Sequence, residues 1–159
     1  MDVVSYVDSV CTSMDDMVRA LSARVVQLAT TIQPDAELAE VQQFLTATFR
    51  EIDEAFVELA RDVAAAGIPD TDDGLEFTRS LQGNLKEARI AFREAGEDFV
   101  ASLEDLSDFG EASKAFAEDV TGVTNELGDA FPEDFPVIDR AEQESETCGR
   151  IGGAGLPPA

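Results

Sequence analysis

Apolar residues recur along this chain about every three and a half positions, in four separate series. The period matches an α-helix, where residues three and four apart share a face, and differs from the period of two of a half-buried strand. Polar and acidic residues fill the positions between, so each series predicts an amphipathic helix. The series run from Val7 to Ile32, from Leu38 to Val63, from Leu81 to Leu106 and from Phe109 to Phe131.

Proline and glycine mark the expected ends of these helices. The first should end at the residue before Pro34, because proline disfavours helical geometry in the residue that precedes it. Gly67 and Pro69 close the second, where glycine suits a left-handed cap. The third is expected to run from about Asp73 to Ser107, and the fourth to stop before Pro132.

Four helices with short connections predict an all-α, up-down-up-down four-helix bundle. The chain of 159 residues, with 44% hydrophobic residues and ten Phe, is long and apolar enough for one folded core, unlike a disordered acidic chain. A short helix near Ile138–Thr147 and a flexible tail rich in Gly and Pro should follow. We therefore expect a bundle domain over 1–148 and a tail over 149–159.

The charge balance narrows the classes of function. The chain has 11 Lys and Arg against 34 Asp and Glu, a formal charge of −23, and no His. The charge argues against DNA or RNA as a partner, and the lack of His excludes Ser–His and Cys–His catalysis and most transition-metal sites. We expect a non-enzyme with no catalytic residue, cofactor or metal. The acidity predicts a solubilising coat or adaptation to a salty habitat, with recognition of a basic partner as the alternative.

Acidic clusters in the chain do not match known site patterns. Counting from Asp70 places Gly74 at position five and Leu81 at twelve, whereas a calcium-binding EF-hand needs glycine at six and glutamate at twelve. We interpret this segment as a turn and a helix N-cap. The adjacent pairs Glu97-Asp98 and Glu118-Asp119 diverge on a helix, so they predict no pair of catalytic carboxylates.

Basic residues form a stripe on the third helix. Arg79, Lys86 and Arg93 recur every seven positions, and Arg89 lies beside them. The simplest interpretation is pairing with carboxylates at i±4 or on a neighbouring helix. The functional alternative is a surface that contacts an anion or a partner.

The two cysteines, Cys11 and Cys148, are too few for a zinc site without His. They predict a disulfide, or else two idle thiols. An even number of helices returns the chain end to its start, so the two could meet. No stretch approaches the roughly 20 apolar residues of a membrane span, and the first residues do not read as a secretory signal.

Three short motifs resemble the small secreted proteins and lipoproteins of actinobacteria such as Streptomyces, which are α-helical and mostly of unknown function. They are Val7-Asp8-Ser9-Val10-Cys11, the turn Ala66-Gly67-Ile68-Pro69 followed by Asp73-Gly74, and Glu146-Thr147-Cys148. The resemblance covers nearly the whole folded region. It implies an extracytoplasmic bundle held by a Cys11–Cys148 bridge, with no catalytic residues. Cys11 does not match the lipobox that many members carry.

Together these observations favour a non-enzymatic binding or cell-envelope module whose partner is a protein or a small ligand. It would be secreted or envelope-associated if an export signal has been removed, and otherwise cytoplasmic. The alternative is a cytoplasmic acidic inhibitor, of the immunity type, that masks a basic partner.

Overall fold

The computed structural model describes residues 1–32, 36–105, 107, 109–128 and 130–151. Within these ranges the chain forms six α-helices and no strand, which confirms the all-α prediction. The helices are α1 (Val3–Thr31), α2 (Leu38–Ala66), α3 (Gly74–Ser102), α4 (Phe109–Gly128), α5 (Pro136–Glu144) and α6 (Glu146–Ile151). The expected break at Gln33-Pro34, the apolar position Leu106, the boundary at Asp108 and the tail over 152–159 lie outside the described residues.

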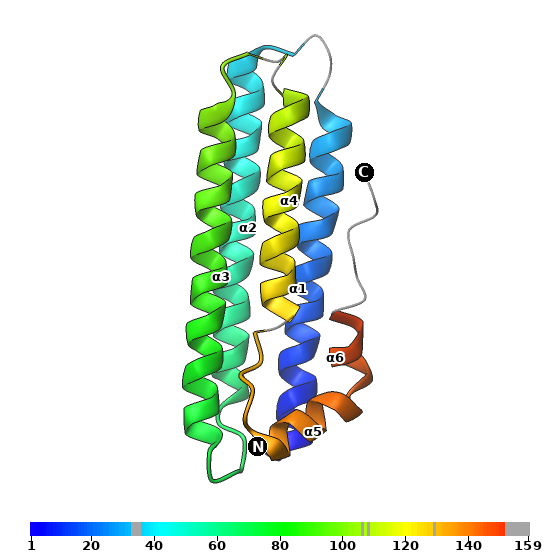
Figure 1. The fold of residues 1–159 in the computed structure, drawn as a ribbon, viewed down its shortest axis with the longest axis vertical. Coiled ribbons are helices and arrows are strands. Elements are labelled where there is room, and N and C mark those ends of the chain that lie inside the picture. Colours follow the sequence, from blue (N-terminus) through cyan, green and yellow to red (C-terminus); the bar gives the residue numbers. More distant parts are fainter. Residues whose placement is uncertain (33–35, 106, 108, 129, 152–159) are drawn as a thin grey trace.

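The four long helices lie side by side along the long axis of the molecule, and each runs opposite to the one before it (Figure 1). The short helices pack against α1, and α5 lies where α1 begins and the α2–α3 connection turns (Figure 1). We call this part of the molecule the α5 end. It brings together three segments far apart in sequence: the start of α1, the α2–α3 loop and residues 135–144.

The predicted apolar series form one core. Val10, Leu45, Leu81 and Val120, one from each long helix, are buried. Aromatic rings fill the part of the core that is further from the α5 end, where Phe49 and Phe116 contact each other and each also contacts Phe92 and Phe99. The ten Phe therefore serve mainly to pack the core. Contacts between aromatic rings stabilise the fold beyond the contribution of burial alone.

Two long helices end earlier than their apolar pattern predicts. α3 stops at Ser102 rather than Ser107, because Leu103 turns to an extended conformation and is buried there. Its carbonyl accepts a hydrogen bond from Gln42 Nε2 at 3.2 Å. α4 stops at Gly128 although the apolar series continues to Phe131. The apolar pattern thus continues past the end of each helix, because the apolar residues there are buried against neighbouring helices.

The expected single helix over 138–147 is two helices separated at Ser145. This residue has extended backbone, and its hydroxyl donates to Asp8 Oδ1 of α1 at 2.7 Å. The prediction that the chain is a flexible tail from residue 149 is wrong for 149–151, which belong to α6. Ile151 is buried in the core, and that burial holds the segment in place.

Candidate functional site

The α2–α3 loop is a tight turn that three backbone features build. Gly67 has a φ of 83°, a left-handed conformation that favours glycine, and it caps α2. The Asp70 N–H donates to the Met1 carbonyl at 3.0 Å, which ties the loop to the start of α1. A Cβ on Gly74 would lie 2.1 Å from the Pro69 carbonyl oxygen, so only glycine fits there. The loop therefore holds Asp70, Thr71, Asp72 and Asp73 in one fixed strip.

Residues 135–138 face this strip from the other side. Pro136 occupies the first turn of α5, a position where its missing N–H costs no helical hydrogen bond. Ile138 is buried, whereas Val137 is 59% exposed. The ring of Phe135 packs edge-on against Phe77 of α3, with centroids 5.3 Å apart. The start of α5 thus offers an apolar wall whose position is set by the core.

Tyr6 supports this wall from inside the molecule. Its ring packs against Phe77 at 6.1 Å and is fully buried. Burial raises the pKa of the Tyr6 hydroxyl. The hydroxyl has no hydrogen-bond partner among the described residues. Tyr6 therefore stays neutral and adds no charge to the α5 end.

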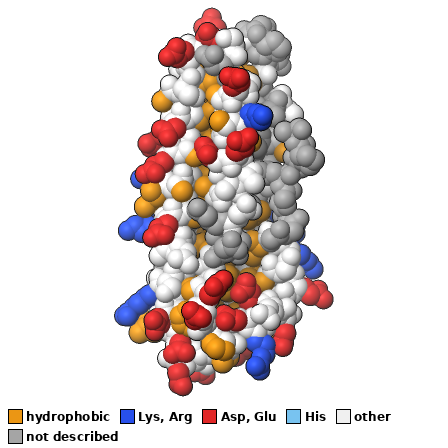
Figure 2. Space-filling model, viewed as in Figure 1, with side chains coloured by type: hydrophobic (Ala, Val, Ile, Leu, Met, Phe, Trp, Pro, Cys, Tyr) orange, Lys and Arg blue, Asp and Glu red, His pale blue; other side chains and the backbone are white. Residues whose placement is uncertain are grey.

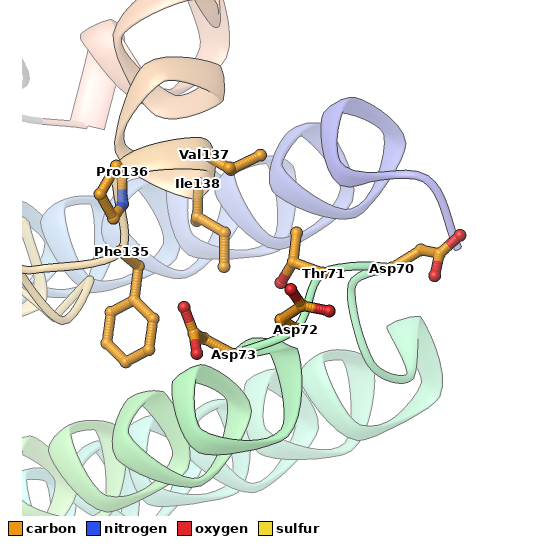
Figure 3. A pocket seen from close by; sticks show the side chains of 8 residues that line it. All are labelled: Asp70, Thr71, Asp72, Asp73, Phe135, Pro136, Val137 and Ile138. Atoms are coloured by element: carbon orange, nitrogen blue, oxygen red, sulfur yellow. The ribbon is translucent and has the colours of Figure 1, made fainter.

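A cavity of about 350 Å³ lies between the acidic loop and the apolar wall. Asp73 directs its carboxylate toward Phe135, while Ile138 points toward the loop and Asp70 turns away toward the start of α1 (Figure 3). Asp73 is the N-cap residue of α3, as expected, but its side chain makes no cap hydrogen bond. Its carboxylate is instead available to a ligand. The complete lining consists of Asp70, Thr71, Asp72, Asp73, Phe135, Pro136, Val137 and Ile138.

The arrangement suits a ligand with a cationic part and an apolar part. Carboxylates on one wall attract positive charge, and the opposite wall gains free energy when aliphatic groups cover it. Thr71 adds a buried hydroxyl oxygen that has no hydrogen-bond partner in the described part of the chain. Within the same ranges, no three acidic or Cys side chains converge as ligands for one metal ion.

A second cavity, of about 440 Å³, lies between the first turns of α1 and residues 141–147. Val4 and Asp8 of α1 line it together with Ala141, Glu144 and Glu146. Asp8 is held in place by the hydroxyl of Ser145. This cavity repeats the combination of carboxylates and aliphatic side chains found in the first.

The structure joins Cys11 to Cys148 beside the second cavity, with the sulfur atoms 2.00 Å apart. Cys11 is fully buried in α1, and Cys148 of α6 is partly buried. The expectation of a bridge, rather than two idle thiols, therefore agrees with the structure. The bridge fixes α6, and through it the end of α5, against α1.

The basic stripe on α3 divides into two kinds of residue. Arg79, Lys86 and Arg93 are exposed, and Figure 2 shows Lys and Arg side chains along the edge formed by α3. Arg89 instead makes two 2.6 Å hydrogen bonds to the carboxylate of Asp53 on α2. The pairing interpretation is thus confirmed for Arg89. A partner contact for the other three stays a prediction.

The Arg89–Asp53 pair should make stability depend on pH in acid. The Arg89 hydrogen bonds lower the pKa of Asp53 from its ordinary value of 3.8. Because the folded pKa is the lower one, the pair stabilises the fold above that ordinary value and the effect is lost as the pH falls through the folded pKa. Asp53→Asn should therefore cost about 1 kcal/mol at neutral pH, and the cost should shrink as the pH falls below 3.8.

Denaturant unfolding of both proteins at several pH values measures that difference. Glu54→Gln is the matched control, because Glu54 lies 4.0 Å from Arg50 and both side chains are more than 70% exposed. We expect it to change stability by less than about 0.5 kcal/mol at any pH. Equal costs for the two variants would show that the bidentate geometry of the pair contributes nothing.

Sequence reasoning missed the two cavities, although it singled out one of their walls. The sequence predicts a turn over Asp70–Gly74, which is correct for its backbone. Its partner wall lies more than sixty positions later, and no periodic pattern links the two. The one available signal was Pro136, since proline suits the first turn of a helix and could have placed the start of α5.

Models of protein families, curated proteins and solved structures were compared with the chain. None matches it. No helix in the described ranges is long and apolar enough to cross a membrane. A function for this chain must therefore be inferred from the geometry of the α5 end.

Proposed function

We propose that this chain is a non-enzymatic binding module, built on an up-down-up-down four-helix bundle, that takes its partner at the α5 end. The first cavity carries the proposal, because its volume of about 350 Å³ is lined by three Asp residues on one side, with the Asp73 carboxylate directed toward the apolar wall on the other. Such a concave mixture of apolar surface and a few polar groups is the usual form of a binding site. A second cavity of the same character is lined by the end of α5 and the start of α1.

We further propose that the module works outside the cytoplasm or at the cell envelope, as the resemblance to small secreted actinobacterial proteins implies. The Cys11–Cys148 bridge supports this, because disulfides persist mainly in oxidising compartments. The second candidate is a cytoplasmic acidic inhibitor that masks a basic partner. The net charge of −23 favours it, since such a field speeds association with any basic surface.

Site-specific photo-crosslinking in the native source tests where the partner binds. A photoreactive amino acid replaces Val137 at the cavity, and the matched control replaces Val26 of α1. Both positions are about half exposed, at 59% and 49%. Val26 lies roughly 33 Å along α1 from Val4, at 1.5 Å per residue. We expect a discrete crosslinked product from Val137 and none from Val26.

The outcomes separate the candidates. The same product from both positions, or no product from Val137, contradicts a binding site at the α5 end.

The mass of the recovered protein, measured with and without reductant and alkylation, tests the compartment. Two free thiols in that protein would contradict the extracytoplasmic proposal and favour the cytoplasmic inhibitor.

A further inference from the structure

One face of α5 connects the two cavities. Val137 lines the first cavity, and Ala141 and Glu144 line the second. These positions are four and three residues apart, so they share a face of the helix. At 1.5 Å per residue, the seven positions from 137 to 144 span about 10 Å. The cavities are therefore neighbours on a continuous surface.

Aliphatic side chains are exposed along this surface. Val137 is 59% exposed and Val4, in the wall of the second cavity, is 57% exposed. Met1 and Ile68 are also about half exposed and belong to the same end, where the Met1 carbonyl accepts from Asp70. Figure 2 shows acidic side chains around hydrophobic atoms at the lower end of this face. Exposed apolar groups that cluster in this way mark an interaction surface.

Both cavities are negatively charged. Asp70, Asp72 and Asp73 line the first, while Asp8, Glu144 and Glu146 line the second. Two basic residues lie nearby. Arg140 of α5 lines neither cavity, and Arg150 lies 3.7 Å from Glu146 with both side chains exposed. The carboxylates outnumber these cations, so the surface keeps a negative potential.

We propose that the two cavities and the α5 face between them form one groove, the α5 groove, that binds a basic segment of a protein partner. The inference rests on the proposed function and names the chemistry of its partner. A cationic side chain enters each cavity, and aliphatic side chains between them cover Val137 and Val4. Charge complementarity selects this occupant, because the aliphatic surface alone would also accept uncharged chains.

The separation of the cavities sets the spacing of the cations. A segment in the polyproline II conformation advances about 3.1 Å per residue with three residues per turn, so side chains at positions i and i+3 lie about 9 Å apart on the same side. The preferred segment thus has two Lys or Arg residues separated by two aliphatic ones. A capped peptide with lysines at positions i and i+3 and two leucines between them is a direct probe.

Calorimetric titration of this peptide into the oxidised protein tests the inference. Asp72→Asn with Asp73→Asn should weaken binding about tenfold, because two carboxylates of the first cavity are lost. Neither side chain makes a hydrogen bond to another described residue, so the fold should survive. Glu118→Gln with Asp119→Asn removes the same charge from an exposed part of α4 and should change affinity less than twofold.

Further probes identify what the groove recognises. A peptide with serines in place of the leucines should bind at least about fivefold more weakly, since the aliphatic surface of the groove is then left uncovered. Equal weakening by the two double variants would show a general attraction to the acidic surface and overturn the inference. Tighter binding of spermidine than of the peptide would also overturn it, in favour of a small polyamine.

The test also separates this inference from the proposed function. A crosslinked product at Val137 with no peptide binding leaves the binding module intact and rejects a basic segment as its ligand. Val137→Glu adds a charge of the same sign as the groove and displaces its aliphatic surface. It should reduce affinity for the leucine peptide more than for the serine peptide, and a uniform loss would contradict the role given to Val137.

Discussion

Replacing Cys11 and Cys148 by alanine should lower the free energy of unfolding by about 5 kcal/mol, because the bridge closes a very long loop. The two residues are 137 positions apart, so the bridge removes much of the conformational freedom of the unfolded chain. Guanidinium unfolding of the oxidised protein and of the double variant measures the difference. We expect helical circular dichroism to be retained before unfolding, because buried apolar side chains from each of α1 to α4 form the core.

Reduction of the wild-type protein provides the control for this prediction. The reduced protein and the double variant should unfold at similar denaturant concentrations. Cys11 is fully buried, and alanine avoids placing an unpaired hydroxyl there, which serine would do. If the oxidised wild type and the double variant unfold at the same denaturant midpoint, the prediction is wrong. Such a result would mean that the unfolded chain is already compact.

The long helices could be predicted from sequence because their signal is local. The series Leu38–Val63 becomes a helix of which Val41, Leu45 and Phe56 are buried, as the period requires. The end of α3 could not be predicted in this way. Leu103 continues the apolar pattern, but its burial in extended backbone depends on its fit against α2.

The contacts between helices are harder to predict from the sequence than the helices themselves. Arg89 and Arg93 look equivalent in the sequence, four positions apart on the same helix. Only the relative register of α2 and α3 places Asp53 opposite Arg89. The groove depends on a similar alignment, since residue 73 and residue 135 face each other only after all four long helices have packed.

Phe77→Ala should destabilise the protein by about 3–5 kcal/mol, the cost of removing a buried aromatic ring and leaving a cavity. Phe77 is fully buried and contacts Tyr6, Phe131 and Phe135. Phe99→Ala is the matched control, because Phe99 is also buried and contacts Phe49, Phe109 and Phe116. Denaturant unfolding should show losses of similar size for the two variants.

The two variants should differ in their effect on the α5 end. Phe135 rests on Phe77, and its carbonyl accepts from the N–H groups of Ile138 and Asp139 at 2.9 Å. Without the Phe77 ring, the start of α5 loses its support, so these two amides should exchange with solvent faster relative to global unfolding. Phe99 lies about 33 Å along α3 from Phe77, so its removal should leave that ratio unchanged. Equal acceleration in both variants would show that α5 opens only when the whole protein unfolds, and that the groove has no local support from the core.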